Sequence, residues 1–149
     1  MSTPRETIWH SGLPDVTAIN ARERSSLTGH MGIIITGVGA DFMTATMPVD
    51  DRTRQVHGRL NGGASVALAE TVGSIAANHT VDPATQAAVG LEINANHIRP
   101  VKDGLVTATA MPEAIGRTTQ VWSVRITDEQ GRLVCISRLT MSVIAVTRA

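Results

Sequence analysis

One carboxylate, Glu70, lies alone in a long apolar stretch of the sequence. Between Arg59 and Asp82 it is the only residue with a formal charge when histidine is counted as neutral. A buried carboxylate costs free energy unless it is paired, hydrogen-bonded or used in chemistry. Glu70 is therefore a candidate nucleophile or general base, and the alternative is a buried carboxylate with a structural partner.

A pair of glycines precedes this carboxylate. Asn61 is a favoured N-cap residue, so Gly62 and Gly63 are expected to begin a helix. Free backbone N–H groups at a helix start can bind a carbonyl oxygen that becomes an oxyanion during a reaction. The alternative is that the two glycines only let the chain turn tightly and pack closely.

The spacing of these groups limits how they can cooperate. Glu70 lies eight residues after Gly62, which is roughly 12 Å along a helix and too far for both to act on one small group. If both are catalytic, Gly62 of one subunit must meet Glu70 of another at a dimer interface. Ser74 lies four residues after Glu70 on the same helical face and could orient it, or could bond back to its own helix.

Other chemical groups are sparse in the sequence. His97 falls in the apolar phase of a predicted strand and is expected to point toward the helix, as a site residue or as a satisfied core histidine. No His, Cys, Asp or Glu cluster has the spacing of metal ligands, and there is no G-x-S-x-G motif or phosphate-binding glycine loop. We expect no metal and no cofactor. The single Cys135 is expected to be a small core residue.

Several elements must hold these groups in place. Residues 55–78 indicate a short loop and a helix that is apolar nearly all round, which is typical of a buried helix. A segment capped by Asp15 or Thr17 could form one or two helical turns. One apolar helix with a mostly antiparallel sheet indicates an α+β fold with the sheet wrapped around the helix, and its long edge strands favour at least a dimer. The alternating patterns predict strands at residues 29–38, 42–49, 89–99, 105–112, 118–127 and 132–146.

Composition narrows the function class. The 149 residues, 42% of them hydrophobic, fit a single domain spanning 1–149. The 13 basic and 13 acidic residues cancel, with no run of like charge, so we expect neither nucleic acid nor a membrane as a partner. The N-terminus lacks a signal-peptide pattern, and no apolar run approaches the roughly 20 residues that cross a bilayer. A cytoplasmic protein is expected.

The central stretch also resembles a known family. Its sequence, Q-V-H-G-R-L-N-G-G-A-S-V-A-L-A-E-T-V-G-S, is similar to the Q-P-F-G-x-L-H-G-G-A-S-x-x-L-A-E-x-x-G-S signature of hotdog-fold acyl-CoA thioesterases. This PaaI-like group contains 4-hydroxybenzoyl-CoA, 1,4-dihydroxy-2-naphthoyl-CoA and enterobactin-pathway proofreading thioesterases. The segments M-P-V-D-D-R-T-R-Q, V-G-L-E-I-N-A-N-H-I-R-P and D-E-Q-G-R-L-V-C-I-S-R-L-T extend the resemblance to about residues 15–145.

The resemblance implies a hotdog fold, a homodimer or dimer of dimers (homotetramer), and hydrolysis of an aromatic or medium-sized acyl-CoA. Glu70 matches the carboxylate that attacks the thioester or activates water, and Gly62 matches the amide that binds the thioester oxygen. In the family these two come from opposite subunits, and Gln55 matches a side chain near that oxygen on the Gly62 side. The other matched positions are Ser74 beside the nucleophile, His97 near the acyl group, and Gly116, Arg117, Thr118 and Arg138 at the CoA nucleotide and phosphates.

Three positions depart from the family pattern. Asn61 replaces a usual His and can cap a helix or donate an amide hydrogen bond, but it cannot carry a proton. His57 replaces a usual aromatic residue and could compensate from the preceding loop. Arg59 replaces an apolar residue, which favours a more polar or acidic acyl group. The alternatives to hydrolysis are a hotdog dehydratase and a non-catalytic acyl-CoA-binding protein. The G-A-S-x-x-L-A-E pattern disfavours the dehydratase.

Overall fold

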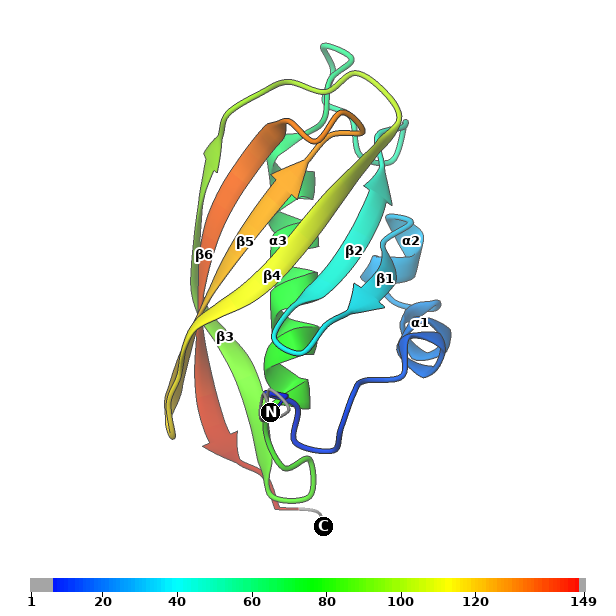
Figure 1. Ribbon diagram of the computed structural model, residues 1–149. Helices are drawn as coiled ribbons and strands as arrows, with labels where there is room; N and C mark the ends of the chain where they lie inside the picture. Colours follow the sequence, from blue (N-terminus) through cyan, green and yellow to red (C-terminus); the bar gives the residue numbers. More distant parts are fainter. Residues whose placement is uncertain (1–6, 148–149) are drawn as a thin grey trace, which may run out of the picture.

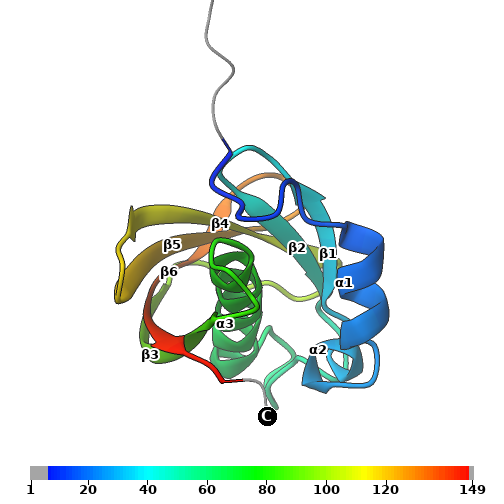
Figure 2. The same ribbon diagram turned by 90° about the horizontal axis from the view of Figure 1, so that it is seen from below.

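The fold is one long helix held in the curve of an antiparallel sheet (Figures 1 and 2). The computed structural model describes residues 7–147, so the N-terminal residues 1–6 included in the signal-peptide prediction lie outside it. Helix α3 spans Gly62–His79, and the sheet order is β1-β2-β4-β5-β6-β3. This arrangement confirms the α+β hotdog prediction. The strands are β1 (Ile34–Val38), β2 (Met43–Pro48), β3 (Gln86–His97), β4 (Leu105–Ile115), β5 (Thr119–Thr127) and β6 (Leu133–Ala145).

Helix α3 begins where the sequence predicts. Asn61 has extended backbone angles, and its Oδ1 accepts a hydrogen bond of 2.7 Å from the Gly63 N–H. Small residues then let the helix lie close to the sheet, because a Cβ at Gly73 would come within 2.6 Å of Leu139 Cδ2. The side chains buried on this face are Ala64, Ser65, Leu68, Ala69, Val72, Ala76 and Ala77.

The opposite side of α3 is less covered within one chain. It carries six half-buried side chains, a strip that we call the outer strip of α3. The prediction of a helix buried all round therefore holds only for the sheet side. The outer strip consists of Val66, Ala67, Glu70, Thr71, Ser74 and Ile75.

The central strands show the alternation that the sequence predicts. Met43, Ala45 and Met47 of β2 are fully buried. On β5, Trp122, Val124 and Ile126 are fully buried and face the same core. Cys135 is buried on β6, as predicted. Burial raises the pKa of its thiol, although the hydrogen bond with the Ser137 side chain acts to lower it.

The prediction of one strand over residues 29–38 is wrong at its start. Residues Leu27–His30 form a short helix, α2, and the strand begins only at Ile34. The Ser26 side chain accepts the Thr28 N–H and so caps this turn. Gly32, at φ +71°, then redirects the chain into β1.

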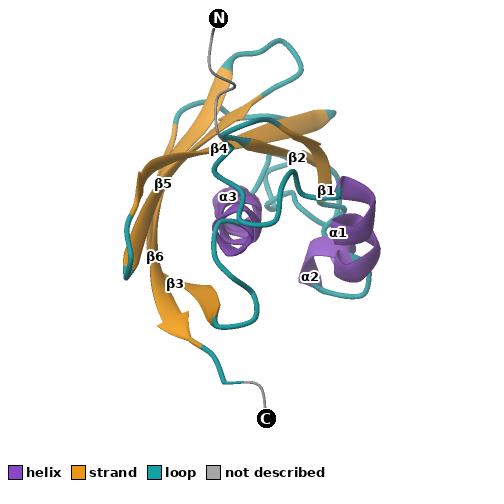
Figure 3. Cartoon of the chain, turned by 60° about the horizontal axis from the view of Figure 1, so that its bottom comes forward, coloured by secondary structure: helices purple, strands orange, loops and turns teal. Residues whose placement is uncertain are grey.

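The helix α1, Val16–Glu23, begins at the predicted cap Asp15, whose carboxylate accepts the Thr17 and Ala18 N–H groups. The two short helices α1 and α2 lie beside β1 at one edge of the sheet, on the far side from β3 (Figure 3). Among residues 7–147, no helix has the length and apolar character needed to span a membrane.

A second prediction, about which side chains of β3 are buried, is wrong in part. An unbroken alternation along the predicted strand would put the apolar residues of the His97 phase on one buried face, but a bulge between Gly90 and Glu92 breaks the alternation. These residues are Val89, Leu91, Ile93, Ala95 and His97. Val89 and Leu91 are exposed, whereas Ile93 and Ala95 are half-buried. A β-bulge inserts an unpaired residue, so the side chains before and after it change faces. A similar irregularity follows Pro112 in β4.

Candidate active site

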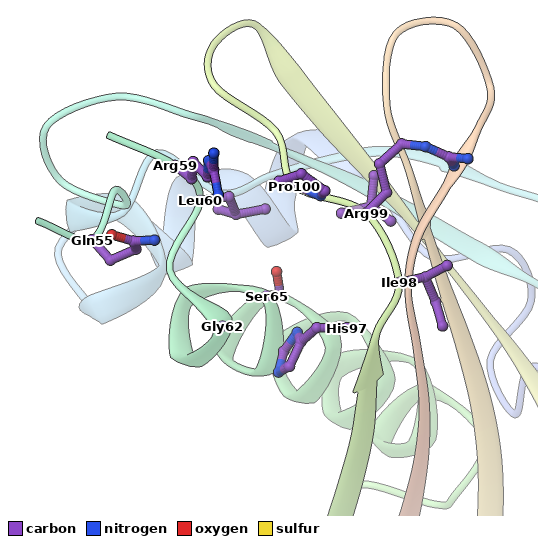
Figure 4. A pocket seen from close by; sticks show the side chains of 10 residues that line it. Gln55, Arg59, Leu60, Gly62, Ser65, His97, Ile98, Arg99 and Pro100 are labelled. Atoms are coloured by element: carbon purple, nitrogen blue, oxygen red, sulfur yellow. The ribbon is translucent and has the colours of Figure 1, made fainter. Parts of the chain in front are cut away.

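The start of α3 lines a cavity of about 330 Å³ (Figure 4). Three predicted site residues, Gln55, Gly62 and His97, meet there from the loop before α3, from the helix itself and from the end of β3. The structure therefore brings together groups that are up to forty-two residues apart in the sequence. The remaining lining residues are Arg59, Leu60, Ser65, Ile98, Arg99, Pro100 and Val134.

The Gly62 N–H is available for binding. In the first turn, the Ala64 and Ser65 N–H groups both donate to the Asn61 carbonyl, and the Gly63 N–H donates to the Asn61 side chain. Within residues 7–147, the Gly62 N–H has no acceptor. A helix start concentrates partial positive charge at such free N–H groups. This N–H can therefore donate to an oxygen that gains negative charge.

His97 packs against the same glycine. A Cβ on Gly62 would lie only 2.9 Å from His97 Nε2, so the imidazole sits where a side chain would otherwise be. The predicted direction toward the helix is confirmed. The side chain is nevertheless exposed, so it is not the satisfied core histidine that was the alternative.

A tight loop holds Gln55 at the edge of the cavity. Arg54 and Leu60 form an isolated β-bridge, and the Gln55 N–H donates to the Arg59 carbonyl at 2.8 Å. The Gln55 side-chain oxygen accepts the His57 N–H, which leaves the amide nitrogen on the side of the helix start (Figure 4). The His57 side chain is exposed and does not line the cavity.

Glu70 lines a different hollow. It is half-buried in a groove of about 360 Å³ between α3 and the α1–α2 segment, together with Arg22, Glu23 and Ser74. Ser74 Oγ donates to Glu70 Oε1 at 3.2 Å, as its position on the helix suggested. The Gly62 cavity and the Glu70 groove share no lining residue, so the two groups do not meet within one chain.

The predicted CoA-binding positions also lie away from the Gly62 cavity. Gly116, Arg117 and Thr118 are exposed in the β4–β5 turn. The next residue, Thr119, pairs with Ser142, whereas His97 pairs with Cys135 at the other end of β6. Arg138 is exposed in the middle of β6. A single chain therefore does not gather these four residues around Gly62.

The sequence did not indicate two residues that lie near Glu70. Gly90 lies against the Glu70 carboxylate, and the Asn78 side chain ties α3 to the backbone of Ala88. The only sequence signal was a glycine within a strand pattern, which indicates a bulge or a close approach. Among residues 7–147, the structure has no group of three or more His, Cys, Asp or Glu side chains that could hold a metal ion.

Comparisons with known proteins identify the family of this chain. The model of the thioesterase superfamily matches residues 57–135. The 1,4-dihydroxy-2-naphthoyl-CoA hydrolase of Escherichia coli is 46% identical over 137 residues, which cover 92% of this chain and 99% of that protein. The crystal structure of a thioesterase from Haemophilus influenzae superposes with a TM-score of 0.91 at 46% identity, covering 95% of this chain and 98% of that one.

The PaaI protein of Escherichia coli is a more distant structural neighbour. It has a TM-score of 0.77 at 27% identity and covers 87% of this chain and 92% of its own. The family model matches just over half of the chain, and the similarity to the two thioesterases at 46% identity covers 92% and 95% of it. This protein belongs to the thioesterase superfamily and is a hotdog-fold thioesterase.

Proposed function

We propose that this protein hydrolyses acyl-CoA thioesters to the free acid and CoA, with Gly62 of one subunit and Glu70 of another acting on the same thioester. The observation that carries the proposal is the Gly62 N–H, which has no acceptor within residues 7–147 and lines a cavity at the start of α3. The relative from Escherichia coli, named a hydrolase of an aromatic acyl-CoA, supports this substrate class.

The proposed chemistry uses two groups on opposite sides of the thioester. The carbonyl oxygen accepts a hydrogen bond from the Gly62 N–H, with the Gln55 amide nitrogen beside it. The Glu70 carboxylate attacks the carbonyl carbon, or removes a proton from the water that does so. The carbonyl oxygen becomes negative as the new C–O bond forms, and the helix start stabilises that charge. The C–S bond then breaks and CoA leaves as its thiolate, which takes up a proton. If Glu70 attacked, the acyl group remains on its carboxylate as a mixed anhydride, which a water molecule hydrolyses to the free acid; if water attacked, the free acid forms directly.

Sharing of the site between subunits follows from the helix. Gly62 and Glu70 line separate cavities within one chain. A second copy placed against the outer strip of α3 would bring its own Gly62 toward Glu70. We propose a homodimer or a dimer of dimers, in which Gly116, Arg117, Thr118 and Arg138 contact the CoA nucleotide and phosphates of a neighbouring site.

The lining of the Gly62 cavity favours a particular acyl group. Arg59 and Arg99 both line it, and its described lining contains no carboxylate. Neither arginine forms an ion pair within residues 7–147. An aromatic or medium-sized acyl group that carries a polar or acidic substituent fits this charge. The proposed chemistry needs no metal and no redox cofactor.

A panel of acyl-CoA thioesters tests the proposal, with release of CoA measured by a thiol reagent. Glu70→Gln is expected to abolish turnover, because the neutral amide is neither a nucleophile nor a base. Glu23→Gln is the matched control, since Glu23 lines the same groove, and it is expected to keep wild-type turnover. A metal chelator should leave the rate unchanged.

Each alternative gives a different outcome in this assay. Full activity of Glu70→Gln would overturn the proposed mechanism. Binding of acyl-CoA without release of thiol would favour the non-catalytic acyl-CoA-binding protein. Formation of an enoyl product from a β-hydroxyacyl thioester would favour the dehydratase.

A further inference from the structure

The Glu70 carboxylate rests against a glycine of the neighbouring strand. A Cβ built on Gly90 would lie 2.5 Å from Glu70 Oε1, 3.5 Å from its Cδ and 3.9 Å from Oε2. The first distance is shorter than carbon and oxygen can approach without repulsion. Glu70 Oε1 therefore occupies space that any other residue at position 90 would fill.

The two oxygens of this carboxylate have different surroundings. Oε1 faces Gly90 and accepts the Ser74 hydroxyl, whereas Oε2 has no hydrogen-bond donor within residues 7–147. Ser74 also lies 3.8 Å from the sulfur of Met141, the residue that pairs with Gly90 across β3 and β6. The surroundings of Glu70 Oε1 are thus formed by Gly90, Ser74 and Met141.

A side chain from the same helix holds the glycine in position. Asn78 Oδ1 accepts the Ala88 N–H at 3.0 Å, and Asn78 Nδ2 donates to the Ala88 carbonyl at 2.8 Å. Nδ2 also donates to the Ser74 carbonyl at 3.0 Å. Through these bonds Asn78 fixes β3 against α3 two residues before Gly90.

We propose that Gly90 is a positioning residue. Its missing side chain leaves the space that Glu70 Oε1 occupies and so directs Oε2 toward the thioester. The hydrogen bonds between Asn78 and Ala88 keep Gly90 at a fixed distance from the helix. This inference rests on the proposed catalytic role of Glu70. It adds that Gly90, which has no side chain, determines where the reacting oxygen of Glu70 lies.

The substitution Gly90→Ala tests this role in the full-length protein. The added methyl group meets the far end of a flexible side chain, so the carboxylate should move while the fold survives. Because a misplaced reacting group costs turnover more than binding, kcat should fall about a hundredfold with KM changed less than about threefold.

Gly37→Ala is the matched control. Gly37 also lies at a bulge in an edge strand without a positive φ, and its added Cβ would meet only the Thr44 hydroxyl at 3.0 Å. It should leave kcat unchanged. An unchanged kcat in Gly90→Ala, or an equal loss in both variants, would overturn the inference.

A double-variant comparison separates a contact with the carboxylate from a general effect on the fold. Glu70→Ala removes the carboxylate, so adding Gly90→Ala to it should not lower the melting temperature further, even if Gly90→Ala alone folds poorly. A double variant that melts well below Glu70→Ala contradicts the contact. If Glu70→Gln keeps its activity, the proposed function fails; if only Gly90→Ala keeps it, the proposed function stands and this inference fails.

Discussion

At the scale of single residues, Asn61 shows how one side chain prepares a binding group by satisfying its neighbours. Its carbonyl accepts two N–H groups of the first helical turn and its side chain accepts a third, so only the Gly62 N–H is left. An imidazole at this position, usual in the family that the sequence resembles, would cap the helix less well. The His57 side chain is exposed and is not among the residues that line the Gly62 cavity.

The Gly62 N–H can be removed while the helix is kept. Gly62 is the first helical residue, a position where proline is well tolerated, and Asn61 already has the extended angles that precede proline. Gly62→Pro is expected to lower kcat by about a hundredfold or more, the usual loss for one oxyanion donor. Thiol release under saturating substrate measures this effect.

Gly62→Ala provides the control for that prediction. It keeps the N–H but adds the same Cβ, which would crowd His97 Nε2. Any loss in Gly62→Ala therefore reports crowding of the imidazole. If the proline and alanine variants lose the same activity, the N–H is not the group that matters.

At the scale of elements, the two ends of α3 have different tasks. The first turn lines the Gly62 cavity, whereas the last turn is anchored to the rest of the fold. There the Thr80 hydroxyl accepts the side-chain amide of Gln120, which is fully buried on β5. Gln120 in turn accepts the indole N–H of Trp122 at 2.9 Å. These bonds join the end of the helix to the middle of the sheet.

The last helical residue, His79, makes stability depend on pH. Burial, and then the nearby charge of Arg22, lower the pKa of His79 below its usual 6.5. Between the folded and unfolded pKa values, the unfolded chain binds more protons, so stability rises with pH there. The stability that the folded protein gains from neutral His79 should be fully present above about pH 6.5, the ordinary pKa of histidine. It should be lost as the pH falls through the pKa of His79 in the folded state. Urea unfolding at a series of pH values measures it.

His79→Gln should flatten this profile between neutral and mildly acidic pH. His30→Gln is the matched control, because His30 is also the last residue of a helix but is exposed. It should leave the slope close to that of the wild type. A wild-type slope in His79→Gln would contradict the assignment.

The same elements show what local sequence can predict. Alternation identified the faces of β2 and β5, and the cap residue fixed the start of α3, because both depend on neighbouring residues. The error at residues 29–38 arose because Ser26 caps a helical turn that apolar periodicity does not reveal. The contact between Gly90 and Glu70 was missed because it depends on how β3 is placed against α3, which no local pattern specifies.

At the scale of the whole molecule, one chain leaves apolar surface and a strand edge uncovered. Val89 and Leu91 of β3 are 41% and 64% exposed, and β3 is an edge strand. Such an edge invites pairing with another chain. The outer strip of α3 is only half-buried as well. A second copy that covers both features would also complete the proposed site.

Mixing of inactive variants tests this shared site. Glu70→Gln and Gly62→Pro are each expected to be inactive alone, because every site then lacks one of its two groups. In a mixed dimer one site receives the intact Gly62 of one subunit and the intact Glu70 of the other. With random exchange of subunits, half of the dimers are mixed and each has one working site, so about a quarter of wild-type activity should return. The exchange is followed by thiol release after the two variants are incubated together. Each variant incubated alone controls for slow recovery, and a mixture that stays inactive after exchange, or a fully active monomer, would show that both groups act within one chain.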